Sequence, residues 1–324
     1  APVLRPAPVP MFLLSALVRE QGIKVLCTGE GADEIFGGYD IFREALVRRF
    51  VLRRPSSIRR ASLFERLYPQ IFRTPREKAS FRQFMTAAPA DPAEPLFSHL
   101  VRWTNTARIK EFFSGDLHAR IGGYSAIEDL TRMLPPDFRR RDLLSRAQYL
   151  EDKIFLSGYL LTSQGDRMAM AHGVEIRPPY LDVRLIDLLS RVPPRWKILG
   201  LDEKHILKKA FRDILPASVV RRTKQPYRAP IQSVFAGRLR SEGYAEALSE
   251  RSIRNAGIFD FSKVARLFRK LDSGASTSET EGMAVAGIVS TQLLVEQAAL
   301  GFPRPRDAET PWDVHVDRTA ASGR

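Results

Sequence analysis

Cysteine and long apolar runs are scarce in this chain of 324 residues. The one cysteine, Cys27, excludes an internal disulfide and a cysteine-cluster metal site. Its place in an apolar segment favours a small buried residue over a catalytic thiol, and we expect a reducing, cytoplasmic compartment. No apolar run reaches the ~18 residues that a membrane span needs. The nearest, Gly282–Leu300, contains polar side chains and predicts a packed amphipathic helix, so no membrane partner is expected.

The first ten residues lack the layout of a signal peptide. They are interrupted by prolines instead of running from a basic start into an apolar stretch. The chain starts with Ala1 and not with methionine, which suggests a processed, trimmed or partial chain.

Acidic residues are outnumbered. There are 37 Asp and Glu against 51 Lys and Arg, which gives a net charge of +14 and a pI near 10.2. Such a balance favours polyanions such as nucleic acid, anionic membranes or phosphate-rich substrates. The arginines are scattered, however, and clusters such as Arg139–Arg141 are typical of solvated faces. Charge alone supports tRNA binding poorly, so we do not predict a nucleic-acid partner.

Strand signals are also few. Ile23–Cys27 predicts a short buried strand, and Met11–Glu20 before it predicts a buried helix with Gly22 as its C-cap. A helix, a strand and then a ligand loop suit a doubly wound parallel sheet. The rest of the chain is predicted to be mostly helical, with helical spacing over Asp40–Val51, Phe97–Phe113, Ala126–Leu134, Leu143–Leu156, Val183–Ser190, Lys204–Leu215 and Val285–Ala299.

The most informative run, Thr28–Glu34, follows this strand directly and is closed by Gly37–Tyr39. It places three carboxylates on a glycine-rich backbone, and glycine lets the main chain approach a ligand closely. Clustered carboxylates repel one another unless a cation lies among them, and Mg²⁺ that carries phosphate oxygens is the usual one. Ligands of open α/β sheets bind beyond the carboxyl ends of strands. We therefore predict a nucleotide–metal site here. A helix start with acidic residues in its first turn is the alternative, which leaves Glu30 unexplained.

Lys204 is a second candidate. Asp202 is predicted to be the N-cap of a helix whose apolar stripe begins at Ile206. A lysine in the first turn of that helix lies at the positive end of the helix dipole, where a cation is disfavoured and a bound anion removes the conflict. The alternative is a solvated lysine at a helix start.

Four motifs, in this order, resemble the synthetase domain of the glutamine-hydrolysing asparagine synthetases. The first is Thr28–Tyr39, in which Thr28 replaces a serine and keeps the hydroxyl. The others are Asp166–Asp182, Glu203–Pro216 and the basic loop Lys224–Pro230. In the second motif, Pro178-Pro179 departs mildly from the usual pattern. Four ordered motifs over about two hundred residues are more specific than any one of them.

The resemblance implies an α/β, mostly helical fold. It would be the C-terminal part of a doubly wound adenine-nucleotide domain of the PP-loop ATP pyrophosphatase type, with a large helical extension. Residues 1–300 would form the ATP-dependent amide-forming domain, without its first strands and pyrophosphate loop, and residues 301–324 a loosely held tail. The family's glutaminase domain, whose nucleophile is an N-terminal cysteine, is absent from this chain.

The implied activity is ATP-dependent amidation of aspartate through an aspartyl-adenylate, which releases AMP and pyrophosphate. Its cofactors would be ATP and Mg²⁺, and its ammonia would come from a glutaminase domain. Asp33 would bind the metal, Glu30 would act around the acyl-adenylate, including as a base toward ammonia, and Lys204 would contact pyrophosphate. The nucleotide contacts would be Thr28, Gly29 and Gly31. Glu175 and Arg177 would position the carboxylate, although ion pairs of this kind often only hold elements together.

The same sequence also fits other functions. The same fold amidates other carboxylates, including cell-surface sugar acids, and closes rings of β-amino acids. The chain could also be an inactive fragment that serves as a subunit, or a relative that modifies tRNA. A homodimer is among the assemblies that the sequence allows.

Overall fold

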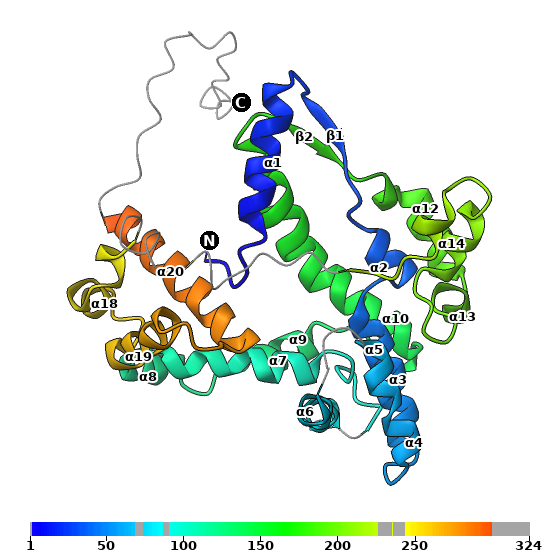
Figure 1. The fold of residues 1–324 in the computed structure, drawn as a ribbon, viewed down its shortest axis with the longest axis horizontal. Helices are drawn as coiled ribbons and strands as arrows, with labels where there is room; N and C mark the ends of the chain where they lie inside the picture. The colour runs from blue at the N-terminus through cyan, green and yellow to red at the C-terminus, as the bar shows by residue number, and fades with distance from the viewer. Residues whose placement is uncertain (1, 69–73, 87–90, 226–234, 236–243, 300–324) are drawn as a thin grey trace, which may run out of the picture.

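The computed structural model describes residues 2–68, 74–86, 91–225, 235 and 244–299 (Figure 1). This part of the chain is mostly helical, and its two short strands form one parallel sheet, in agreement with the predicted mixed class. Within it, no helix is both long and apolar enough to cross a lipid bilayer. The tail predicted over 301–324 lies outside the described residues.

The sheet pairs β1 (Val25–Cys27) with β2 (Glu175–Arg177), with Leu26 opposite Ile176. The predicted strand is therefore confirmed in its last three residues. Its predicted burial is wrong, because Val25 is 42% exposed and Cys27 is exposed as well. The physical reason is that β1 packs mainly against its partner β2 in the described structure, so its side chains lack a covering layer.

The first helix, α1 (Pro8–Glu20), lies along η3, a π-helix over Glu151–Asp166, and along the short α11 (Arg167–Met170) (Figure 1). The C-cap of the helix is Gln21, and Gly22, which was predicted in that role, follows it at φ +74°. The predicted burial of this helix is wrong, because its leucines are among the most exposed apolar side chains. Leu13 is 62% exposed, since only one side of α1 contacts its neighbours.

The connection from β1 to β2 runs through helices. They are α2 (Ala32–Phe36), α3 (Asp40–Leu52), α4 (Ile58–Ala61), α5 (Leu63–Leu67), α6 (Pro75–Thr86), α7 (Leu100–Ala107), η1 (Arg108–Phe112), α8 (Gly115–Ile121), α9 (Ala126–Arg132), η2 (Phe138–Arg140) and α10 (Leu143–Leu150), which continues into η3 and α11. The predicted helices beginning at positions 40, 126 and 143 are confirmed. The helix predicted over Phe97–Phe113 begins at Leu100 as α7, and its last part forms the tight 3₁₀ turn η1 instead of α-helix.

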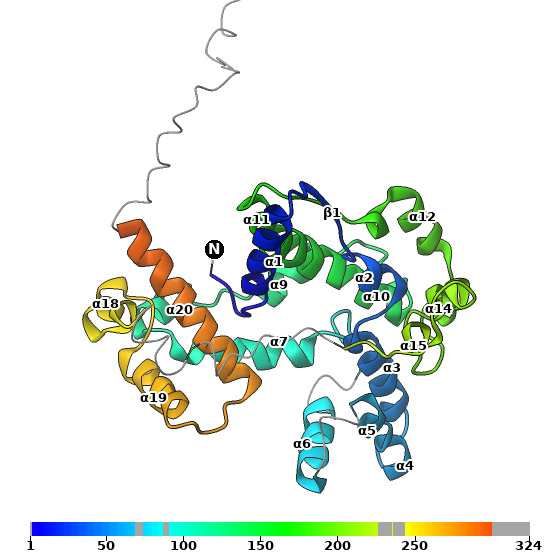
Figure 2. The same cartoon turned by 45° about the horizontal axis from the view of Figure 1, so that its top comes forward.

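Beyond β2 the chain folds into two groups of helices at opposite ends of the molecule (Figures 1 and 2). The first group is η4 (Pro179–Leu181), α12 (Val183–Arg191), α13 (Pro194–Lys197), α14 (His205–Phe211) and α15 (Ala217–Val220). The second is η5 (Glu246–Leu248), α18 (Glu250–Ala256), α19 (Phe261–Asp272) and α20 (Glu279–Ala299).

Two regions of the core bear on function. The second helical group packs on η1 around an apolar cluster that includes Ile253, Leu271 and Val285. The first group packs on α2, where Ile35 and Phe36 meet Leu189 of α12. The helix that follows the glycine-rich loop is thereby set against α14, which is more than 160 residues away in the sequence.

Candidate functional site

The loop from Thr28 to Gly31 leaves β1 while it is still attached to β2. The backbone N–H of Thr28 donates to the carbonyl oxygen of Arg177 at 3.0 Å, one residue beyond the paired strands. Gly31 then takes φ +90°, and a Cβ there would lie 2.3 Å from Leu181 Cδ2. Only glycine suits both the backbone angle and this close approach. These contacts therefore fix the backbone conformation of the loop that leads into α2.

Asp33, in the first turn of α2, lies between two lysines from distant segments. Lys204 Nζ donates to its Oδ1 at 2.9 Å, and Lys224 Nζ donates to its Oδ2 at 2.6 Å. The three side chains are only 15–25% exposed. Lys224 Nζ also lies 5.7 Å from the ring centroid of Tyr39. The structure thus brings Asp33 and Lys204 together, as predicted, and adds Lys224.

These contacts make the site a cationic one. Burial by itself raises the pKa of the Asp33 carboxyl, but the ammonium groups of Lys204 and Lys224 outweigh it and hold that pKa below its ordinary value. One negative charge faces two positive charges, so the three side chains carry an excess of one positive charge. Such a group suits a polyphosphate that brings its own negative charges.

Gly38 leaves room for the Asp33 carboxylate. A Cβ at position 38 would lie 2.0 Å from Asp33 Oδ1. The Gly38 backbone N–H also donates to the Asp33 carbonyl oxygen at 2.7 Å, which closes the turn after α2. Asp33 is therefore aimed at the lysines partly because residue 38 has no side chain.

The backbone at Lys204 corrects one prediction. Lys204 precedes α14 and has φ +52°, which makes it the one non-glycine residue with positive φ in the described part of the chain. The left-handed conformation costs a residue with a Cβ about 1–2 kcal/mol, and strain of this kind gathers at functional sites. The predicted N-cap, Asp202, does not cap the helix, because its carboxylate binds His205 and Lys208 side chains. The helix also ends at Phe211 and not at Leu215.

Of the three loop carboxylates, Glu34 does not share a cation site with Asp33. Glu34 is 1% exposed and accepts a hydrogen bond from the Tyr39 hydroxyl at 2.8 Å, below the loop. Burial raises the pKa of the Glu34 carboxyl, although the Tyr39 contact opposes this. In the described residues no group of three His, Cys, Asp or Glu side chains could hold a metal ion. The acidic cluster seen in the sequence is therefore split, because successive residues of α2 face different sides.

A polar group under α2 was not predicted. Gln148 of α10 donates through Nε2 to the carbonyl oxygens of Glu34 and Ile35, and its Oε1 accepts from Lys197 Nζ at 3.1 Å. Burial lowers the pKa of Lys197. Burial, together with the nearby carboxylates of Glu34 and Glu151, raises the pKa of Asp152 to about 7. These residues fall in ordinary helical sequence patterns and carry no local signal of their contacts.

Thr28 and Glu30 offer buried oxygens that point to a ligand. Thr28 Oγ1 and Glu30 Oε2 are buried and have no hydrogen-bond partner in the described structure. A buried polar atom without a partner costs free energy, so an added donor or cation would be favoured. Mg²⁺ commonly takes one or two protein carboxylates and completes its shell with phosphate and water oxygens. Asp33, Thr28 and Glu30 therefore fit a magnesium–nucleotide, and Gly29 leaves the loop backbone open, since a Cβ there would touch nothing within 4 Å.

Glu175 and Arg177 are not joined to this group. They pair with each other, Arg177 Nε donating to Glu175 Oε1 at 2.7 Å, and both side chains are more than half exposed. This pairing is the structural alternative weighed for them in the sequence. Their role in holding a substrate carboxylate stays a prediction. Lys224, by contrast, lies in the basic loop motif, and its cationic side chain was the signal by which it could have been singled out. The rest of that motif, 226–230, lies outside the described residues.

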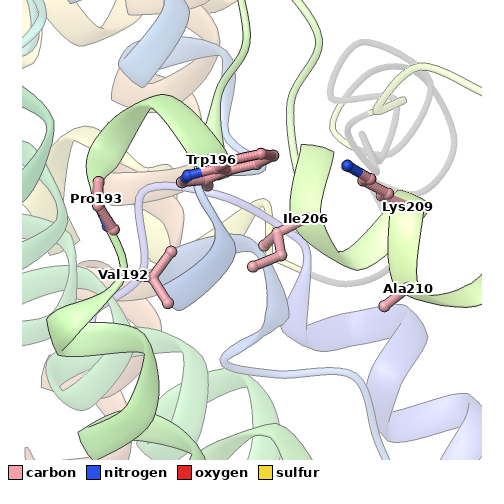
Figure 3. Close-up of a pocket in the computed structure, with 6 residues that line it drawn as sticks. All are labelled: Val192, Pro193, Trp196, Ile206, Lys209 and Ala210. Atoms are coloured by element: carbon pink, nitrogen blue, oxygen red, sulfur yellow. The ribbon is translucent and has the colours of Figure 1, made fainter.

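A separate pocket of about 440 Å³ lies between α13 and α14 (Figure 3). Its lining is almost wholly apolar and includes Trp196 and Ile206, while Lys209 Nζ lies 5.0 Å from the Trp196 ring centroid. None of the predicted site residues lines it. A single lysine over an aromatic ring is a poor match for a triphosphate, and the Asp33 group, with its two lysines, is the better match.

Comparison with known proteins gives one family. The model of the family described as asparagine synthase matches residues 1–296. The chain is 29% identical over 280 residues to a putative glutamine-hydrolysing asparagine synthetase of Mycobacterium bovis, which covers 85% of this chain and 40% of that protein. It is 28% identical over 233 residues to asparagine synthetase 1 of Bacillus subtilis, covering 71% of this chain and 34% of the relative.

A relative with another name is also similar. The amidase chry2 of Gibberella zeae is 29% identical over 264 residues, 76% of this chain and 38% of that protein. The chain thus spans about two fifths or less of the length of these curated relatives.

Proposed function

This chain belongs to the asparagine synthase family, and we propose that it supplies the ATP-using part of an enzyme that amidates aspartate. The carboxylate of aspartate would displace pyrophosphate from ATP to give an aspartyl-adenylate. Ammonia, released from glutamine by another part of the protein, would then displace AMP and form the amide. The observation that carries the proposal is the meeting of Asp33, Lys204 and Lys224 at the end of β1.

The first step needs positive charge at the phosphates. When the aspartate oxygen bonds to the α-phosphorus, the bond from that phosphorus to the bridging oxygen breaks and pyrophosphate leaves with the electron pair. Lys204 and Lys224 would bind the departing phosphates, which lowers the energy of the charge that develops there. Mg²⁺ held by Asp33 would supply further neutralisation of that charge.

The second step needs a proton acceptor. The nitrogen of ammonia bonds to the acyl carbon, the bond to AMP breaks, and the nitrogen then loses a proton. Glu30, whose Oε2 is buried without a hydrogen-bond partner among the described residues, would accept that proton. The Thr28 hydroxyl and the backbone at Gly29 and Gly31 would contact the nucleotide. A substrate-positioning role for Glu175 and Arg177, a cytoplasmic setting and a domain boundary near residue 300 belong to the same proposal.

The test is carboxylate-dependent exchange of labelled pyrophosphate into ATP, measured with the full-length protein and Mg²⁺. We expect exchange with aspartate and little with glutamate or a panel of sugar acids. Lys204→Met should remove the exchange, while Lys209→Met, in the helix α14 that follows Lys204, should keep it. Exchange with a different carboxylate alone would refute aspartate as the substrate, and no exchange with any carboxylate would refute the ligase.

A further inference from the structure

The backbone of Lys224 is held by a carboxylate that has no part in the chemistry above. The Lys224 N–H donates to Glu203 Oε1 at 2.8 Å. Glu203 immediately precedes Lys204 in the chain. Glu203, which binds the backbone of Lys224, is therefore the covalent neighbour of Lys204, although Lys204 and Lys224 are 20 positions apart.

Glu203 is itself fixed from two sides. It is 1% exposed. Arg43 of α3 brings Nη1 to 3.5 Å from Oε2, and Lys208 of α14 brings Nζ to 3.3 Å from Oε1. Arg43 also donates to the carbonyl oxygen of Leu201 at 3.3 Å, which ties α3 to the segment before Glu203. A buried carboxylate between two cations has few ways to move, because any displacement leaves buried charges unpaired.

The backbone turn at Lys204 lets the side chains of Glu203 and Lys204 lie in different surroundings. With Lys204 at φ +52°, Glu203 is almost wholly buried while the Lys204 ammonium reaches Asp33. The buried Glu203 therefore holds both lysines in place. Lys204 is the next residue in the chain, and the backbone of Lys224 is hydrogen-bonded to the Glu203 carboxylate. Both ammonium groups reach the same carboxylate from this point.

We propose that Glu203 is a positioning residue that holds Lys224 opposite Asp33, so that Lys204 and Lys224 act together on one polyphosphate. This inference rests on the proposed function, in which Lys224 binds the departing phosphates, and adds one residue to it: Glu203, which places Lys224. Glu203 touches no substrate. Its effect on nucleotide binding passes through Lys224, and this distinguishes it from a residue that only stabilises the fold.

The test is a double-mutant cycle in the full-length protein, with the dissociation constant of ATP in the presence of Mg²⁺ measured by calorimetry. Glu203→Ala and Lys224→Met should each weaken binding about tenfold, since each removes the same ion–phosphate contact. The double variant should bind no more weakly than Lys224→Met alone, because Glu203 has nothing left to position. Glu203→Gln, which keeps an acceptor oxygen for the Lys224 N–H, should recover most of the affinity.

Two variants separate positioning from loss of fold. Glu203→Met fills the same volume without an acceptor oxygen and should repeat the result of Glu203→Ala where the smaller side chain unfolds the protein. Glu44→Ala removes another buried glutamate, which lies on the same helix as Arg43 and binds Arg102 and Tyr68. This variant should leave the ATP affinity unchanged.

The outcomes distinguish this inference from the proposed function. Losses that multiply to about a hundredfold in the double variant, with normal wild-type binding, overturn the positioning role of Glu203 and leave the proposed function standing. Unchanged affinity in Lys224→Met overturns the role of Lys224. A wild-type protein that binds no ATP with Mg²⁺ overturns the proposed function and this inference with it.

Discussion

The Asp33 region and the helical group around α20 are stabilised by different kinds of contact. Around α20, apolar side chains such as Ile253 and Val285 are fully buried in one large cluster. Around Asp33, a few polar bonds join segments that are 171 and 191 positions apart. The region around α20 is stabilised by many small dispersion contacts, whereas single charged groups determine the geometry around Asp33. Substitutions should therefore affect stability in one region and chemistry in the other.

The largest expected effect is on activity. Asp33→Asn removes the charge that attracts the metal and both lysines, and we expect pyrophosphate exchange to fall about 10²–10³-fold, as when a transition-state contact is lost. The urea midpoint should change little, since the lysines can turn toward water. Exchange at the wild-type rate would show that the site lies elsewhere.

The apolar group should respond in the opposite way. Ile253→Ala creates a cavity at a side chain with 0% exposure and should lower the free energy of unfolding by about 2–5 kcal/mol. The exchange activity of the molecules that remain folded should not change. Ile58→Ala, at a position 81% exposed, is the control and should cost less than about 0.5 kcal/mol. A lower kcat/KM in folded Ile253→Ala would contradict the separation of the two regions.

A buried acid should make stability depend on pH. The pKa of Asp152 is raised to about 7 from an ordinary value of 3.8, so between these pH values the folded state keeps a proton that the unfolded chain has lost. The free energy of unfolding then falls as pH rises through that window. Asp152→Asn should remove this loss and make the protein more stable than wild type at pH 8, by about 2 kcal/mol.

Chemical unfolding from pH 4 to pH 8 measures this effect. Asp213→Asn, whose side chain is 85% exposed, should follow the wild-type curve. If Asp152→Asn shows the wild-type slope, Asp152 is ionised throughout this range and the assignment fails.

The smallest effect concerns backbone strain at Lys204. Lys204→Gly and Lys204→Ala should both lose pyrophosphate exchange, because both lack the ammonium group. The glycine variant should be more stable than the alanine variant by about 1 kcal/mol, since only glycine adopts positive φ without cost. Thermal unfolding of the pair measures the difference. Equal stability, or a more stable alanine variant, would mean that this residue is not left-handed in solution.

Part of this site could be predicted from the sequence. The loop Thr28–Tyr39 and Lys204 were found because glycines, carboxylates and a lysine beside a helix form local patterns. Glu34 was misjudged because its burial comes from tertiary packing, in which its carbonyl oxygen accepts from Gln148, 114 positions away along the chain. Glu203 carried no local signal, since a glutamate beside a lysine is common on surfaces. What links these residues is tertiary contact, and no spacing rule encodes it.

The fold was predictable to a similar extent. Most helices were placed because apolar spacing reports which side of a helix is buried. The exposure of Leu13 and Val25 was not predictable, because an apolar pattern does not say which neighbour covers it. The helix start after Asp202 was misplaced because the carboxylate is used by His205 and Lys208 and the chain turns once more, at Lys204, before the helix begins.

Gly38 has a consequence for how this protein could lose its function. The oxygen of Asp33 occupies the space that the first side-chain atom of any other residue would need at position 38. One added methyl group at position 38 would displace the Asp33 carboxylate from Lys204 and Lys224. The site would then lose its function, although every ionisable residue would still be present. A relative that keeps each charged residue but lacks this glycine would look intact in a motif search and be unable to aim its aspartate.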